Sequence, residues 1–229
     1  AQATIGGMTG NNSCGARSVR YGTMRDNVRA ITGILADGQR RRFDTLEEGV
    51  PRNGLEEELV AIGVSEAEEI SRRFPKVQRR VGGYNIDALT LSDKTEGINL
   101  AHLLVGSEGT LAFSEAIELQ LVQVPKHKVL GVCHFPKFYA AMEASQHLVT
   151  LGPCAVELVD QTMIDLSREN SVFRPVIERC VKGEPEALLL VEFAGESRDE
   201  QLVALKRLHE LMDDLGFADS VVDAVDPQF

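Results

Sequence analysis

The 229-residue sequence lacks several features that would assign it directly to a class of protein. No apolar run approaches the roughly 20 residues that a membrane-spanning helix needs, and no secretory signal peptide is recognisable. Basic residues are also in deficit, since 24 Lys and Arg against 35 Asp and Glu give a formal net charge of -11. An acidic surface repels nucleic acid and anionic membranes, which argues against non-specific binding to either, whereas a local Arg cluster would still accept an anionic ligand.

Cysteine is scarce as well. The chain has four cysteines, none close enough to another to form a CxxC pair: Cys14, Cys133, Cys154 and Cys180. This spacing argues against zinc and redox motifs, and a disulfide framework is not expected in so long and cysteine-poor a chain. We expect free thiols in a cytoplasmic protein. Cys14 is interpreted as a small buried residue, because no histidine near it in the sequence would activate its thiol.

Motifs for nucleotide binding and nucleophilic catalysis are also absent. Neither the GxxxxGK[ST] pattern of a P-loop nor GxGxxG occurs. The segment Gly106-Ser107-Glu108-Gly109 is not a GxSxG nucleophile elbow, because its serine is second in a GxxG spacing. No histidine is evidently placed to activate Ser107. The sequence therefore predicts no catalytic base within this chain.

Two glycine-rich segments are present instead. The first, TIGGMTGNNSCG over residues 4–15, has glycines at 6, 7, 10 and 15 and no helix signal. Glycines let the backbone approach a ligand closely, and successive N–H groups can form an anion-binding nest. The alternative is a tight structural turn. In the second segment, residues 106–111, Glu108 either accepts hydrogen bonds from a ligand or braces the loop. Three arginines that follow the first segment, at 17, 20 and 25, face a ligand or are surface charge.

The first part of the chain, residues 1–125, combines short strands and helices. Strands are expected at 28–35 and 40–43, joined by the Asp-Gly turn at 37–38. Residues 54–74 are predicted to be helical, with a capping box of Ser65 and Glu68 and a stop at Pro75. A short helix is expected at 99–104. One bent strand or a strand pair is predicted at 111–124, with Ile117, Leu119, Leu121 and Val124 as its apolar residues.

Residues 126–229 show a different, alternating pattern. Strands are predicted at 129–135, 155–159 and 187–193, and helices at 138–151, 160–168 and 197–215. The last helix places six apolar residues on one face: Leu202, Leu205, Leu208, Leu211, Met212 and Leu215. We therefore expect a small α+β sandwich with helices on one face of an antiparallel sheet.

Four motifs in a fixed order resemble one known family. GGMTGNNSCGARSVRYGTMRDNV, LADG, GGYNIDAL and HLLVGSEGTLAF look like FAD-linked oxidases of the vanillyl-alcohol-oxidase (PCMH-type) superfamily. The resemblance is strongest to the D-lactate dehydrogenase and glycolate oxidase group, in particular to long bacterial members with an iron–sulfur region after the flavoprotein part. It implies that residues 1–125 are the second subdomain of a PCMH-type FAD-binding domain and residues 126–229 part of an antiparallel-sheet cap domain that binds substrate.

The resemblance also implies which residues approach the cofactor. In this family the first loop lies beside the flavin ring and its ribityl chain, and a second loop lies on the flavin side. Carried over to this sequence, the first set is Ile5, Gly6, Gly7, Asn11, Asn12 and Gly15, with Tyr21 and Gly22 nearby. The second set is Gly106, Glu108, Gly109 and Thr110.

Two features of the family have no counterpart in this sequence. No earlier glycine-rich loop for the FAD pyrophosphate precedes the first motif, and the five histidines do not match the HxxxGxxH-like metal motif of related dehydrogenases. No metal site is therefore predicted. The chain is expected to be a central fragment of a longer flavoprotein, without turnover on its own. A homodimer through the apolar face that the absent lobe would leave uncovered is also expected.

The resemblance implies a reaction for the parent protein. It would oxidise a 2-hydroxy acid such as D-lactate or glycolate by hydride transfer to the flavin of FAD and pass electrons to a further acceptor. Two other interpretations stay open at this point. The chain is then either a flavin-free, inactive domain fragment or a small oxidoreductase whose partner chain supplies the absent lobe.

Overall fold

The computed structural model describes residues 2–47, 53–77, 79–90 and 97–225, which form two compact units. The first unit comprises Ala1–Gly15 and Gly22–Val122. The second comprises Gln123–Phe229 and also the short segment Ala16–Tyr21 from the N-terminal part of the chain. In the part that the structure describes, no helix is both long and apolar enough to cross a membrane. Among the same residues, no group of three or more metal-ligating side chains is present.

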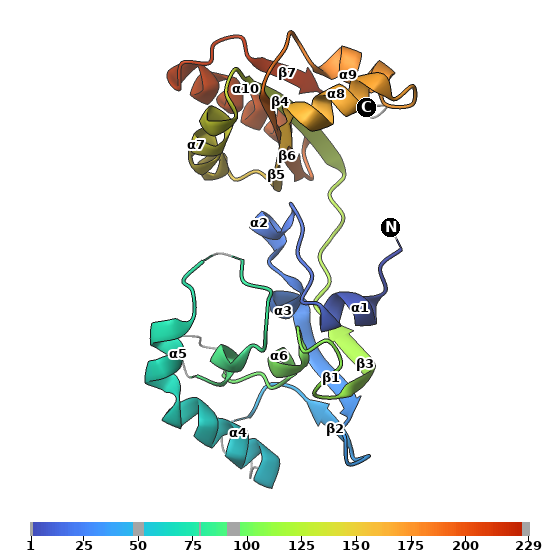
Figure 1. The fold of residues 1–229 in the computed structure, drawn as a ribbon, viewed down its shortest axis with the longest axis vertical. Helices are drawn as coiled ribbons and strands as arrows, with labels where there is room; N and C mark the ends of the chain where they lie inside the picture. Colours follow the sequence, from blue (N-terminus) through green and yellow to red (C-terminus); the bar gives the residue numbers. More distant parts are fainter. Residues whose placement is uncertain (1, 48–52, 78, 91–96, 226–229) are drawn as a thin grey trace. The chain divides into compact units, whose positions relative to one another are not determined.

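The first unit is built on a three-stranded antiparallel sheet with the order β2-β1-β3 (Figure 1). Its strands are β1 (Val28–Ile34), β2 (Arg40–Phe43) and β3 (Phe113–Leu119). The hairpin predicted from the Asp-Gly pair is confirmed, because Ile31 lies opposite Phe43 and Gly38 takes a φ of 82° in the turn. Ile31 is fully buried in the apolar core of this unit, with Leu104 and Val105.

Helices and short turns complete the first unit. Their bounds are α1 (Ile5–Gly10), α3 (Met24–Asn27), α4 (Gly54–Ser65), α5 (Ala67–Arg73), the 3-10 turn η1 (Ile86–Leu89) and α6 (Ala101–Leu104). The predicted helix at 54–74 is in fact two helices, and the predicted Ser65 capping box is wrong. Ser65 donates its hydroxyl to the carbonyl of Ile62, whereas the capping box forms at Asn53 with Glu56.

The predicted strand at 111–124 is too long at both ends. Strand β3 stops at Leu119, and the side chains of Leu121 and Val124 are 79% and 80% exposed. Ile117 and Leu119 do pack against the core of the first unit. Among the described residues no strand pairs with the chain after Leu119, so the apolar residues there do not form a strand.

The second unit is built on a four-stranded antiparallel sheet with the order β5-β6-β4-β7. Its strands are β4 (His127–Phe135), β5 (Ala155–Asp160), β6 (Ala187–Gly195) and β7 (Val221–Ala224). Its helices are α2 (Ser18–Tyr21), α7 (Phe138–Leu148), the 3-10 turn η2 (Val149–Leu151), α8 (Gln161–Glu169), α9 (Arg174–Cys180) and α10 (Arg198–Asp214). The predicted strands and helices of this half are all present, whereas α9 and β7 are additional.

The prediction that helices cover only one face of this sheet is wrong. Residues of β4 alternate between two apolar clusters, as the period of two in a strand requires. Cys133 and Phe135 pack with α7 and α10, while Val132 packs on the opposite face with Ile164 of α8 and Cys180 of α9. Helix α10 buries Leu205, Leu208 and Met212 against the first of these clusters, whereas Leu202 is 38% exposed.

Candidate functional site

The first glycine-rich segment is partly a helix, contrary to the prediction of a loop. Helix α1 is capped at its start by the Thr4 side chain, which accepts a hydrogen bond from the Gly7 amide at 3.1 Å, and it ends at Gly10 with Asn11 as its C-cap. The chain then turns at Asn12, whose φ of 47° lies in the left-handed region that asparagine tolerates better than most residues. The N-cap residue Thr4 is a helix signal in the sequence, but Gly6 and Gly7 shortly after it favour the prediction of a loop.

The second segment forms a tight loop beside the end of α1. Three of its six residues have positive φ: Gly106 at 81°, Glu108 at 54° and Gly109 at 77°. Its backbone is joined to α1 by two hydrogen bonds, from the Gly106 amide to the Thr9 carbonyl at 2.9 Å and from the Glu108 amide to the Gly10 carbonyl at 3.0 Å. The backbone of Glu108 therefore braces the loop, which leaves its exposed side chain available for a ligand.

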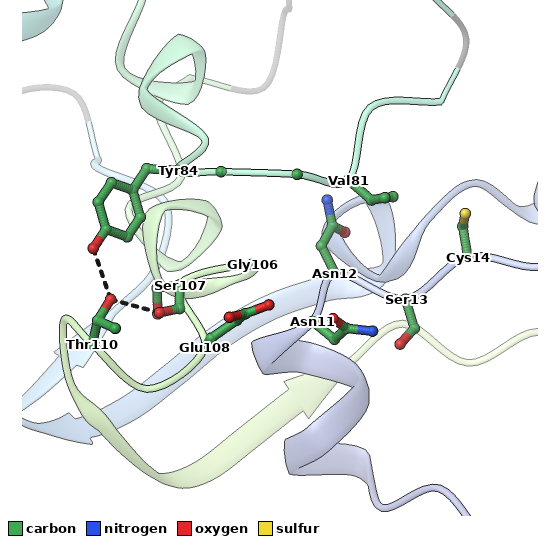
Figure 2. A pocket seen from close by; sticks show the side chains of 12 residues that line it. Asn11, Asn12, Ser13, Cys14, Val81, Tyr84, Gly106, Ser107, Glu108 and Thr110 are labelled. Atoms are coloured by element: carbon green, nitrogen blue, oxygen red, sulfur yellow. Dashed lines mark hydrogen bonds between the residues drawn. The ribbon is translucent and has the colours of Figure 1, made fainter.

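A third segment, residues 81–84, closes a pocket of about 480 Å³ with the first two. The pocket lies wholly within the first unit. Figure 2 shows the Tyr84 hydroxyl turned towards Thr110, with which it forms a hydrogen bond of 2.8 Å. Twelve of the described residues line the pocket: Asn11, Asn12, Ser13, Cys14, Val81, Gly82, Gly83, Tyr84, Gly106, Ser107, Glu108 and Thr110.

The structure brings together five of the twelve residues assigned from the resemblance. These are Asn11, Asn12, Gly106, Glu108 and Thr110. The other seven do not line the pocket. Ile5, Gly6 and Gly7 lie on exposed parts of α1, Gly15 and Gly109 are exposed nearby, Gly22 packs against Asp26, and Tyr21 belongs to the second unit. A cofactor role for any of the twelve stays a prediction.

The segment 81–84 is the main component that the sequence-based site omits. Its signal was available, since GGYN is part of one of the four motifs, but its place beside the other two loops depends on contacts distant in sequence. Gly82 and Gly83 face open space, because a Cβ built on either would meet no atom within 4 Å. A ligand can therefore approach this stretch of backbone closely.

Below the pocket, polar residues join the three segments. Asn12 is fully buried, and its Oδ1 accepts a hydrogen bond of 2.9 Å from the Arg25 amide. The Arg25 guanidinium in turn pairs with Asp87 at 2.8 Å. Arg25 is therefore neither a ligand contact nor free surface charge, and its side chain is only 14% exposed.

Arg17 and Arg20 are also engaged by protein groups, in the second unit. Arg17 forms two hydrogen bonds with the Glu192 carboxylate, and Arg20 donates to the carbonyl of Ala194 at 2.7 Å. Burial alone would raise the pKa of Glu192, but hydrogen bonds from Arg17 and Cys154 outweigh it and lower that pKa. The sequence left these two arginines as either ligand-facing or surface charge, and in the structure both are bonded to protein groups of the second unit.

The lining favours a neutral polar ligand group. It offers the side-chain amide of Asn11, the hydroxyls of Ser13 and Thr110, and exposed backbone, and none of the described lining residues is Lys or Arg. Glu108 adds a carboxylate, which disfavours a nearby phosphate by charge repulsion. Ring carbonyls and hydroxyl-bearing chains fit this donor and acceptor set, whereas a pyrophosphate would find no cation among these lining residues.

Cys14 is exposed at this pocket, so its interpretation as a small buried residue is wrong. The other three cysteines are buried, and burial raises the pKa of each, to about 12 for Cys133 and Cys154. At pH 8 their thiols stay protonated and shielded, so we expect a thiol reagent to modify the folded chain at Cys14 alone. Mass spectrometry would show one label when folded and four in denaturant. A Cys14→Ser variant that still takes up one label when folded would contradict this assignment.

Two family models match the chain. Residues 1–44 match the FAD binding domain, and residues 124–228 match the C-terminal domain of FAD linked oxidases. The chain therefore contains the end of an FAD-binding domain followed by the C-terminal domain found in these enzymes. These two segments are therefore similar to two domains of the FAD-linked oxidase family.

Curated relatives agree with this assignment. D-2-hydroxyglutarate dehydrogenase of Haemophilus influenzae is 28% identical over 90% of this chain, and that of Pseudomonas putida is 30% identical over 87%. D-lactate dehydrogenase of Archaeoglobus fulgidus is 29% identical over 89%. The chain spans 22%, 21% and 35% of the length of these three relatives.

The fold is also found in a solved structure. Alkyldihydroxyacetonephosphate synthase superposes on 97% of this chain with a TM-score of 0.56, and the match covers 34% of that protein. The sequences are only 16% identical, so the likeness concerns the fold alone. The α+β architecture with antiparallel sheets is thereby confirmed.

Proposed function

We propose that this chain is the flavin-facing and substrate-domain part of an FAD-dependent dehydrogenase that oxidises a 2-hydroxy acid. Its matched relatives are named D-2-hydroxyglutarate and D-lactate dehydrogenases, which supports a D-2-hydroxy acid as the substrate class. A glycolate-oxidising activity and an iron–sulfur region in the whole protein remain predictions from the motif resemblance. FAD, when bound, supplies the acceptor for the hydride that leaves the hydroxyl-bearing carbon.

One observation carries the proposal: a glycine-lined pocket without basic side chains sits where three of the family's motifs meet. The neutral part of FAD, which is its ring and ribityl chain, matches the hydroxyls, amides and open backbone of this pocket. The negatively charged pyrophosphate does not match it, because Glu108 would repel it. In this proposal residues 11–14, 82–84 and 106–110 hold and orient the flavin half, and the pyrophosphate is held by other parts of the protein.

The residues of this chain would hold polar groups in fixed positions around the ligand. The Tyr84 hydroxyl is fixed by Thr110 at 2.8 Å, and the Thr110 hydroxyl donates to the Ser107 carbonyl at 2.6 Å. These contacts join residue 84 of the third segment to the loop at 106–110 and fix the turn of that loop. Polar groups that are already fixed can bind a ligand without a further ordering cost.

The test compares parts of FAD on the full 229-residue chain. We expect riboflavin, which is the ring with its ribityl chain, to bind nearly as tightly as FAD, whereas ADP neither binds nor competes. Quenching of flavin fluorescence measures the affinities. Bound riboflavin should also slow labelling of Cys14 by about tenfold, because that thiol lines the same pocket. The Cys14→Ser variant lacks this thiol, so any labelling that it still shows measures reaction at other groups.

Three results would contradict the proposal or its placement of the flavin. One is an absence of riboflavin binding up to millimolar concentration. Another is displacement of FAD by ADP, which would place the adenine half at this pocket. If riboflavin binds but leaves Cys14 labelling unchanged, the flavin lies elsewhere on the chain and the pocket assignment is wrong.

A further inference from the structure

The pocket's three walls come from segments far apart in sequence, and one carboxylate below the pocket is connected to all of them. Asp87 lies in η1 and does not line the pocket. Its Oδ2 pairs with Arg25 at 2.8 Å and its Oδ1 with Arg80 at 2.5 Å. The side chains of Asp87, Arg25 and Arg80 are 26%, 14% and 16% exposed, so solvent screens both ion pairs only partly.

The first wall, residues 11–14, is connected through Arg25. The Arg25 guanidinium is held by Asp87, and the Arg25 amide donates to Oδ1 of the buried Asn12 at 2.9 Å. Asn12 has a positive φ of 47°, a conformation that costs free energy and persists only where neighbouring groups fix it. The turn between α1 and Ser13 therefore depends on where Asp87 places Arg25.

The second wall, residues 81–84, is connected through Arg80, the residue immediately before it. The Arg80 guanidinium pairs with Asp87 and stacks over the Phe74 ring at 4.6 Å. With its side chain held twice, Arg80 fixes the start of the open glycine stretch, which has few contacts of its own. A Cβ built on Gly82 or Gly83 would meet no atom within 4 Å, so side-chain packing does not hold these two residues in place.

The third wall, residues 106–110, is connected through Asn85. The Asn85 Oδ1 accepts hydrogen bonds from Arg80 at 3.0 Å and Arg25 at 3.4 Å, so the same two guanidinium groups orient its amide. Its Nδ2 then donates to the carbonyl of Val105 at 2.8 Å, directly before Gly106. Asn85 is 1% exposed, so a change in its orientation would leave a buried amide unpaired.

We infer that Asp87 is a positioning residue that holds the three walls of the pocket in one arrangement. Ligand affinity therefore depends on a side chain that the ligand does not touch. Because two cations share this one carboxylate, its removal leaves two partly buried guanidinium groups without their anion, and both would move towards solvent. All three walls would then loosen together. The part of this inference that concerns the ligand rests on the proposed function.

Asp87→Asn, which keeps the size of the side chain and removes its charge, tests this. The readout is hydrogen exchange at three amides, called the wall amides: that of Arg25, which bonds to Asn12 of the first wall, and those of Gly106 and Glu108, which bond the third wall to α1. We expect exchange at these amides to rise at least tenfold, while amides in the centre of β1, such as Ile31, change little. Riboflavin affinity should fall about tenfold. Glu118→Gln is the matched control, since it breaks an ion pair with Arg42 in the same unit, away from the pocket, where both partners are more than half exposed.

The outcomes distinguish a role of Asp87 in positioning the walls from a role in stabilising the whole unit. If exchange accelerates equally at β1 and at the three wall amides, Asp87 only stabilises the unit. If exchange at the wall amides is unchanged, Asp87 does not hold the walls. Either result overturns the inference. The exchange measurement needs no flavin, so it stands even if the unaltered chain fails to bind riboflavin and the proposed function falls. If Asp87→Asn does not fold, Arg80→Gln replaces it as the test, because this variant keeps the ion pair between Asp87 and Arg25. Faster hydrogen exchange at the wall amides, without a similar increase at β1, then supports the inference.

Discussion

Replacing Leu208 by alanine is expected to lower the free energy of unfolding of the second unit by about 3–5 kcal/mol. Leu208 is fully buried in the centre of α10, where it packs against strand β4. The loss combines the transfer free energy of the removed carbons with the cost of the cavity that they leave. Chemical denaturation measures it, and exposure of Cys133, Cys154 and Cys180 reports on this unit alone, because all three cysteines belong to it.

A neighbouring glycine offers an internal control for this prediction. A Cβ at Gly131 would lie 2.4 Å from Cδ2 of Leu208 and 3.1 Å from Cδ1 of Leu205, so Gly131→Ala alone should destabilise by about 1–3 kcal/mol through overpacking. In Leu208→Ala the obstructing atom is absent, and the new methyl group partly fills the cavity. The double variant should therefore lose at least about 1 kcal/mol less than the two single losses added together. Simple additivity would show that the two positions do not share this space.

Replacing Gly106 by alanine is expected to weaken riboflavin binding by at least tenfold and to cost about 1–3 kcal/mol of stability in the first unit. Gly106 has a φ of 81°, which strains any residue with a Cβ. That Cβ would also lie 3.2 Å from the Cβ of Asn12 and 3.4 Å from the carbonyl oxygen of Gly83. One methyl group on the third wall is therefore too close to the first wall at Asn12 and reaches contact with the second wall at Gly83. Fluorescence titration and thermal unfolding measure the two effects.

Gly109→Ala separates the two causes. Gly109 has nearly the same φ, 77°, but a Cβ there would meet no atom within 4 Å. It should lose stability through backbone strain and keep most of its riboflavin affinity. Equal losses of affinity in both variants would mean that backbone strain, rather than contact among the three walls, governs the pocket.

The second unit could be predicted from the sequence more fully than the first because its signals are local. Helix α10 has a serine cap and a repeating apolar face, and β6 is a continuous apolar run. The faces of the sheet were not predictable in the same way. Whether Ile164 packs beside Val132 or beside Phe135 depends on the path of the chain after Asp160, and no short pattern encodes that path.

The pocket shows the same division. Each of its loops carries a readable glycine or asparagine signal, and two of the three were assigned from motif resemblance. What the residues did not reveal is the set of contacts below them. Asp87 in GGYNIDAL looks like an ordinary helix-turn aspartate, yet it pairs with Arg25, 62 residues earlier in the chain. Long-range ion pairs have no periodicity, so a single sequence does not expose them.

The short segment Ala16–Tyr21 gives the second unit a piece of chain from far upstream. Its Arg17 meets a carboxylate 175 positions later, at Glu192. During synthesis from the N-terminus this segment leaves the ribosome long before the strand that it joins, so the second unit cannot be completed as its own residues emerge. The entropy cost of closing so long a loop grows only slowly with length, but such closures delay folding. The order of translation thus makes the attachment of Ala16–Tyr21 a late event in the assembly of the second unit.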